Sequence, residues 1–111
     1  MDIEKLKKEI VERLKPLNPE KIILFGSYAY GIPNEDSDID IFLITKKLDV
    51  EDERLFTRKA RKLIRDLIFK YNVGFDILSA YSEEIKSRRD YFFREEILKK
   101  GKILYEQDSS N

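Results

Sequence analysis

Three aspartates are the residues whose side-chain type and spacing are most typical of a catalytic or metal-binding site. Asp38 and Asp40 stand two residues apart at the start of the apolar run IFLI (residues 41–44), and Asp76 has apolar residues on both sides. Residues two apart in a strand point to the same face, so Asp38 and Asp40 share a face. Asp76 joins them if its strand is a neighbour. Carboxylates gathered in this way repel one another unless a cation lies between them.

A divalent metal ion is the ligand that such a patch predicts. Carboxylate oxygens favour hard cations such as Mg²⁺ or Mn²⁺, and Mg²⁺ completes its coordination with water and phosphate oxygens. Two ions about 3.5–4 Å apart could hold the attacking and leaving oxygens of a nucleotidyl transfer. In the alternative, Asp38 caps the strand start, Asp40 lies half-exposed at an edge and Asp76 pairs with a lysine. Three aspartates together in strands this apolar favour the metal site.

The composition restricts the chemistry further. The chain has 111 residues, which predicts one domain, and it contains no Cys and no His. Thiolate nucleophiles, zinc thiolate sites and imidazole bases are therefore excluded, so carboxylates must supply any acid–base group. The 22 basic and 22 acidic residues balance, so direct binding of nucleic acid or of a membrane is not expected. The charged N-terminus and the short apolar runs predict neither a signal peptide nor a membrane span, and the cytoplasm is the expected location.

The periodicity predicts an α+β domain with one sheet and helices packed on it. An amphipathic helix over 2–15 is followed by a buried strand over 22–25 and a short helix over 27–30 that Ser27 caps. The remaining predicted elements are a strand over 37–45, a helix over 50–71, a strand over 73–78, a helical region over 82–100 that breaks near Asp90, and a strand over 102–106. Residues 107–111 form a polar tail.

Gly26 and Ser27 supply the second part of a nucleotide site. Glycine lets the backbone approach a ligand closely, and the amides at a helix start can hold an anion. The pair alone is also what a simple glycine turn with a serine cap would show. Its spacing to Asp38 and Asp40 is what favours a phosphate site.

This combination resembles the minimal nucleotidyltransferases of the DNA polymerase beta superfamily. Gly26-Ser27, ten residues and then Asp38-Ile39-Asp40 match the family signature, and Gly31, Ser37, the strand around Asp76 and the closing strand over 101–106 also fit. The resemblance covers essentially the whole chain and implies a nucleotidyltransferase fold over residues 1–106, with strands and helices alternating in one mixed sheet. Tyr30 departs from the pattern, because many relatives carry an arginine near this position that could touch phosphate.

The family roles are carried over residue by residue. Gly26, Ser27 and Ser37 would bind the nucleotide, with ATP as the substrate. Asp38 and Asp40 would bind both Mg²⁺ ions, with Mn²⁺ as the alternative metal. Asp76 would help to bind the second ion and would activate the attacking hydroxyl.

Members of this minimal size resemble the antitoxins of two-gene modules whose toxin is a HEPN ribonuclease. The resemblance implies transfer of AMP from ATP to a tyrosine of that toxin. Two other functions stay open on the sequence. One is a binding module that neutralises the toxin without catalysis, and the other is a homodimeric transferase that acts on a small molecule.

Overall fold

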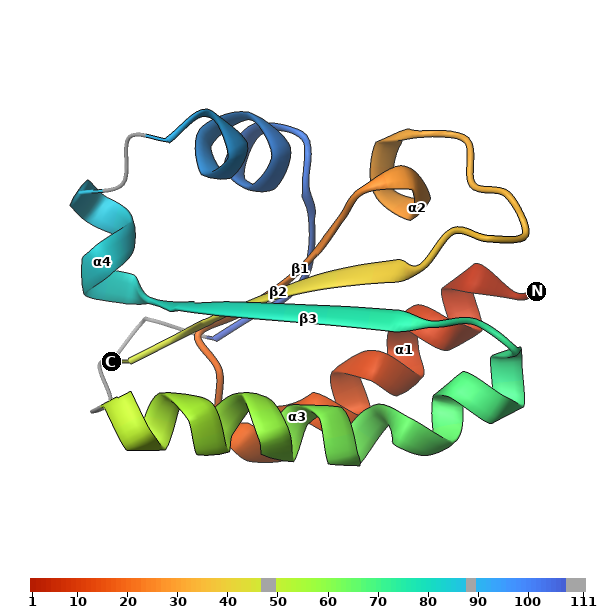
Figure 1. Cartoon of the computed structure of the whole chain (residues 1–111), viewed down its shortest axis with the longest axis horizontal. Coiled ribbons are helices and arrows are strands. Elements are labelled where there is room, and N and C mark those ends of the chain that lie inside the picture. Colours follow the sequence, from red (N-terminus) through yellow and green to blue (C-terminus); the bar gives the residue numbers. More distant parts are fainter. Residues whose placement is uncertain (47–49, 88–89, 108–111) are drawn as a thin grey trace.

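The computed structural model describes residues 1–46, 50–87 and 90–107, which form a four-stranded mixed sheet between two layers of helices (Figure 1). The elements in chain order are α1 (Ile3–Leu14), the 3₁₀ turn η1 (Lys15–Leu17), β1 (Lys21–Phe25), α2 (Ser27–Tyr30), β2 (Ile39–Thr45), α3 (Val50–Tyr71), β3 (Phe75–Tyr81), α4 (Ser82–Ser87), the π-helix η2 (Phe92–Lys99) and β4 (Lys102–Glu106).

The strand order across the sheet is β3-β2-β1-β4. β1 is antiparallel to both β2 and β4, whereas β2 and β3 are parallel. A parallel pair needs a crossover connection, and α3 provides it. The α+β class and the single mixed sheet predicted from the sequence are therefore confirmed.

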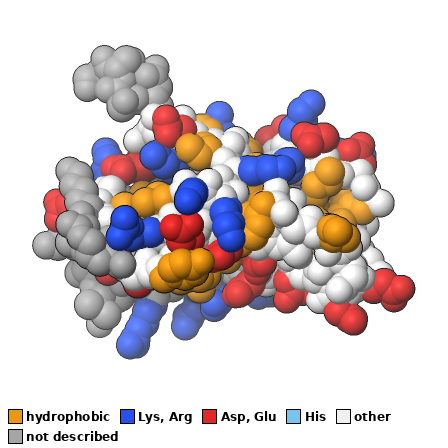
Figure 2. Space-filling view, turned by 90° about the horizontal axis from the view of Figure 1, so that it is seen from above, with side chains coloured by type: hydrophobic (Ala, Val, Ile, Leu, Met, Phe, Trp, Pro, Cys, Tyr) orange, Lys and Arg blue, Asp and Glu red, His pale blue; other side chains and the backbone are white. Residues whose placement is uncertain are grey.

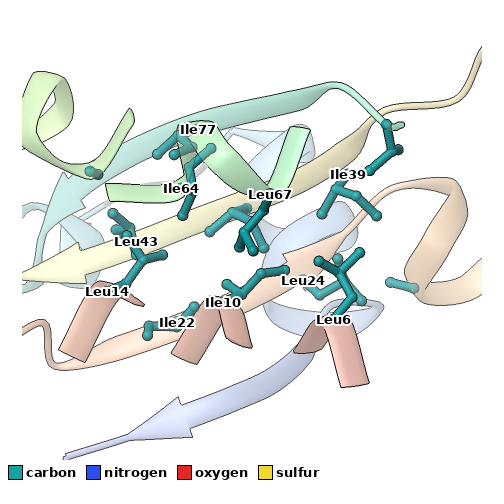
Figure 3. Packing of buried hydrophobic residues seen from close by; sticks show 14 of the residues in the cluster. Leu6, Ile10, Leu14, Ile22, Leu24, Ile39, Leu43, Ile64, Leu67 and Ile77 are labelled. Carbon is teal, nitrogen blue, oxygen red and sulfur yellow. The ribbon is translucent and has the colours of Figure 1, made fainter. Parts of the chain in front are cut away.

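The helices α1 and α3 cover one face of the sheet (Figure 1). Leu6, Ile10 and Leu14 recur at helical spacing along α1 and are fully buried. They pack with the side chains of alternate sheet residues and with Ile64 and Leu67 of α3 (Figure 3). Both α1 and α3 bury an apolar stripe against the sheet, and the helical spacing of these apolar residues is why the sequence predicts both helices correctly.

The opposite face carries α4 and η2 over a smaller apolar cluster (Figure 1). The short α2 lies on the same side, but its buried Ala29 packs with the larger cluster. The ring of Phe42 in β2 lies 5.4 Å from the ring of Phe93 in η2 and 6.4 Å from that of Phe25 in β1. Because β1 and β2 are buried on both faces, their sequences are apolar almost throughout. Asp40, the second residue of β2, is the acidic exception.

Several predicted boundaries are wrong. β2 begins at Ile39, so Asp38 lies just before the strand rather than in it. β3 runs over Phe75–Tyr81 instead of 73–78, because it pairs along the full length of β2. The strand therefore follows its partner further than its own alternation indicates.

The break near Asp90 is confirmed. α4 ends at Ser87, residues 88–89 lie outside the described residues, and η2 starts afresh at Phe92. The Asp90 carboxylate accepts a hydrogen bond of 3.0 Å from the Phe93 amide, which caps this second helix.

The tail prediction falls mostly outside the described residues, which end at Gln107. The Gln107 amide donates to the Glu20 carbonyl, and its side chain donates to that of Asn18. No described helix is both long enough and apolar enough to cross a membrane.

Candidate active site

The pairing of β2 with β3 brings two of the predicted aspartates into one row. Asp40 is the register partner of Asp76 in β3 and of Phe25 in β1. Neighbouring side chains in register point to the same face of a sheet. Asp40 therefore lies between Phe25 and Asp76 on the face that carries α2 and η2. Asp38 lies outside this row, just before β2 begins, with its carboxylate against Gly74.

Asp40 carries the clearest electrostatic signature of the site. Burial raises the pKa of its carboxyl, and the charges of Asp76 and Asp38 raise it further, to about 6. Within the described part of the chain, no side chain donates a hydrogen bond to these three carboxylates and no lysine or arginine pairs with them. Of the alternative in which these aspartates are structural, Asp76 has no lysine partner among the described residues, and Asp40 lies in an inner strand instead of an edge strand.

Two glycines lie directly against two of the carboxylates. A β-carbon added to Gly26 would lie 3.1 Å from the carboxyl carbon of Asp40, and one added to Gly74 would lie 3.1 Å from that of Asp38. In each case a carboxylate oxygen would be closer still. The two carboxylates therefore lean in different directions, Asp40 towards the β1–α2 turn and Asp38 towards the start of β3.

Gly26 and Ser27 form that β1–α2 turn, but not with the predicted cap. Gly26 has φ of 77° and occupies the N-cap position, and Ser27 is the first residue of α2. No side chain caps the helix, so the predicted Ser27 cap is wrong. Because α2 has only four residues, its macrodipole is small, and any anion site there depends on the amides of the turn.

Ser37 has a local hydrogen-bonding role. Its hydroxyl accepts from the Asn34 amide at 2.9 Å, and its own amide donates to the Asn34 carbonyl at 3.1 Å. These bonds close the loop that leads into β2 and thereby fix the approach to Asp38. Binding of nucleotide by Ser37 remains a prediction.

A contact that the sequence did not predict ties α2 to η2. The Tyr30 hydroxyl donates to the Glu96 carboxylate, and the Lys100 ammonium lies 5.5 Å from the centre of the Tyr30 ring and 3.4 Å from a Glu96 oxygen. Burial and the Glu96 hydrogen bond raise the pKa of Tyr30, and Asp40 adds to this effect. The contact joins residues 66 apart in sequence, so no local pattern could have indicated it.

Comparison with known proteins identifies the family. The model of the family described as polymerase beta, nucleotidyltransferase, matches residues 4–110. The chain belongs to this nucleotidyltransferase family. Two proteins of Methanocaldococcus jannaschii, provisionally named protein adenylyltransferases, are similar to it. One is 34% identical over 95% of this chain and 100% of its own, and the other is 33% identical over 77% and 81%.

Two solved structures share the fold of this nucleotidyltransferase. One is a mutant of the toxin–antitoxin MntA-HpeT, with a TM-score of 0.60 and 21% identity, and the other is a toxin–antitoxin with AMP-PNP, with a TM-score of 0.56 and 22% identity. Each match covers 91% of this chain and 73% of the other. These likenesses confirm the minimal nucleotidyltransferase fold that the sequence predicts.

The carboxylates of the candidate site fit a divalent cation if ligands from elsewhere complete its coordination. All candidate ligands are carboxylate oxygens, and the raised pKa of Asp40 marks negative charge that a cation would compensate. Among the described residues, no three acidic side chains converge closely enough to enclose an ion by themselves. This agrees with the divergence of Asp38 and Asp40, and with the preference of Mg²⁺ for few protein ligands and several phosphate or water oxygens.

The face that carries the site combines acidic and basic regions (Figure 2). Acidic side chains are more frequent towards the right-hand end, where α2 and the loop before β2 lie, and basic ones towards the centre. A separate groove of about 540 Å³ lies between α1 and β4. It is lined by residues of α1 and β4, by Lys15 of η1 and by none of the three aspartates, so it is not the candidate active site.

Proposed function

We propose that this chain is a metal-dependent protein adenylyltransferase that transfers AMP from ATP to a tyrosine hydroxyl of a HEPN-type toxin and so acts as its antitoxin. The observation that carries the proposal is the placement of Asp76 and Asp38 around Asp40, beside the Gly26–Ser27 turn, where the pKa of Asp40 is raised to about 6. Membership of the nucleotidyltransferase family and the names of the two relatives support it.

The proposed reaction joins AMP to the acceptor hydroxyl and releases pyrophosphate. The acceptor oxygen forms a bond to the α-phosphorus of ATP, the bond from that phosphorus to the bridging oxygen breaks, and pyrophosphate leaves. Mg²⁺ or Mn²⁺ at this site would neutralise charge on the phosphates. Asp38 and Asp40 would hold the metal, and the turn amides of Gly26 and Ser27 would orient the phosphates, with Ser37 beside them.

Asp76 is the group placed to receive the acceptor proton. It is exposed, whereas Asp40 is half-buried, so a hydroxyl from another molecule can reach Asp76 directly. A carboxylate base agrees with a chain that contains no histidine. The acceptor loses its proton to Asp76 as its oxygen attacks.

The HEPN toxin is the proposed acceptor because both fold neighbours come from toxin–antitoxin structures. The test mixes the chain with the product of the neighbouring gene, ATP and Mg²⁺, and weighs both proteins by intact mass spectrometry. We expect the mass of one AMP residue to be added to the partner. Asp38→Asn should abolish the addition, whereas Asp36→Asn, an exposed neighbour in the same loop, should retain it.

The other outcomes distinguish the remaining functions. A stable complex without added mass would overturn the proposal in favour of neutralisation by binding. Transfer to a small acceptor in the absence of any partner would instead indicate a stand-alone transferase.

A further inference from the structure

Gly74 lies in the short connection from α3 to β3, two residues before Asp76. The left-handed residue of this connection is Asn72, with φ of 52°, and Gly74 does not have a positive φ. The turn therefore does not need glycine at position 74 for its backbone conformation. Another reason must account for a residue without a side chain at this position.

The carboxylate of Asp38 occupies the space that a side chain on residue 74 would take. A β-carbon there would lie 3.1 Å from the Asp38 carboxyl carbon and 3.7 Å from its second oxygen, with the first oxygen nearer than van der Waals contact allows. On the backbone side, the Gly74 carbonyl accepts a hydrogen bond of 2.8 Å from the Ile39 amide. This bond fixes the Gly74 backbone next to Ile39, the residue that follows Asp38.

We propose that Gly74 is a positioning residue for the metal–nucleotide site, because its missing side chain leaves Asp38 room to hold its carboxylate in the binding orientation. This inference rests on the proposed function of Asp38 as a metal ligand. Gly26 bears a similar relation to Asp40, but its φ of 77° already requires glycine. Gly74 is the position where the carboxylate alone accounts for the residue.

A side chain at position 74 should disturb binding more than folding. The atoms that it would meet are the end of an exposed aspartate side chain, which can rotate away. Gly74→Ala is therefore expected to fold, with the Asp38 carboxylate turned from its place. Residues that orient metal ligands typically change metal affinity by about 10–100-fold when mutated, and a loss of at least about tenfold is expected here.

The experiment measures binding of Mn²⁺ with AMP-PNP, which needs no turnover, in four proteins: the unmodified chain, Gly74→Ala, Asp38→Ala and the double variant. Gly74→Ala should bind at least about tenfold more weakly, and it should add nothing once Asp38 is alanine. Asn72→Gly, which alters the same connection at an exposed left-handed position, should bind as the unmodified chain does. Unchanged affinity in Gly74→Ala, or an equal loss with and without the Asp38 carboxylate, would overturn the proposal.

Failure of the proposed function gives a different result. If the unmodified chain does not bind Mn²⁺ with AMP-PNP, Asp38 is not a metal ligand, and the positioning role falls with it. A crystal structure of metal-free Gly74→Ala tests the contact separately. A rotated Asp38 side chain would support the steric account, and an unmoved one would refute it.

Discussion

Asp40 is the residue of the candidate site at which burial and repulsion between carboxylates act together. It lies half-buried in an inner strand, with Asp76 in register beside it and Asp38 two residues before it. Burial and both like charges oppose its ionisation, and no described cation offsets them. Such an arrangement reduces the stability of the metal-free protein, and that cost is typical of sites that bind a charged ligand.

The titration of Asp40 should make the metal-free protein less stable as pH rises. Its pKa is 3.8 in the absence of interactions and about 6 in the folded chain, so the folded state binds the proton more tightly. The free energy of unfolding contributed by Asp40 therefore falls as pH rises between these two values. Asp40→Asn should remove this part of the pH profile and, because solvent screens the half-buried group, add about 1 kcal/mol of stability at neutral pH.

Urea unfolding at a series of pH values without metal measures this effect. Asp36→Asn, at an exposed loop position, serves as the control and should keep the profile of the unmodified chain. Parallel pH profiles for Asp40→Asn and the unmodified chain would mean that the carboxylates do not interact.

At the scale of elements, the short α2 depends on its neighbours. Four residues make too few helical hydrogen bonds for an independently stable helix. α2 is anchored by the buried Ala29 and by the hydrogen bond from Tyr30 to Glu96 in η2. The position of the Gly26–Ser27 turn therefore depends on a helix that follows it by more than sixty residues.

Tyr30→Phe should loosen α2 while leaving the fold intact. Removing the hydroxyl breaks the bond to Glu96 but keeps the aromatic ring. The net value of one hydrogen bond corresponds to amide exchange in α2 that is about two- to tenfold faster. Hydrogen exchange followed by mass spectrometry would detect this, with Tyr91→Phe as a control because Tyr91 is 71% exposed. Equal exchange in the two variants would show that the contact with Glu96 does not hold α2.

At the scale of the whole molecule, the sheet separates the larger apolar core from the candidate active site. The layer of α1 and α3 contributes the larger apolar core (Figures 1 and 3). Asp40 and Asp76 lie on the other face. Asp40 and Asp76 can stay in register despite their like charges because β2, which is buried on both faces, pairs with β3 along its full length. A ligand that binds only this assembled arrangement must stabilise the whole fold.

Mg²⁺ with ATP is therefore expected to raise the melting temperature. A ligand at 100 times its dissociation constant adds about 2.7 kcal/mol to the free energy of unfolding. Mg²⁺ alone should have a much smaller effect, because Asp38 and Asp40 diverge and phosphate oxygens must complete the coordination. Differential scanning calorimetry with Mg²⁺, ATP and both together tests this, and an equal shift in Asp38→Asn would contradict binding through that carboxylate.

Local patterns in the sequence were sufficient to predict the elements and the family. The helical spacing of Leu6, Ile10 and Leu14 predicts α1, and the interval between Gly26-Ser27 and Asp38-Ile39-Asp40 indicates the family, which the comparisons confirm. These features depend on neighbours along the chain, so periodicity and spacing record them. The roles of the individual site residues remain predictions.

Only the tertiary structure decided which residues meet. The pairing of Asp40 with Asp76, the approach of the Asp38 carboxylate to Gly74 and the bond from Tyr30 to Glu96 all join segments distant in sequence. The same cause explains the misplaced ends of β3, which pairs along the whole of β2. Strand register and side-chain direction depend on non-local packing, which no short window of sequence contains.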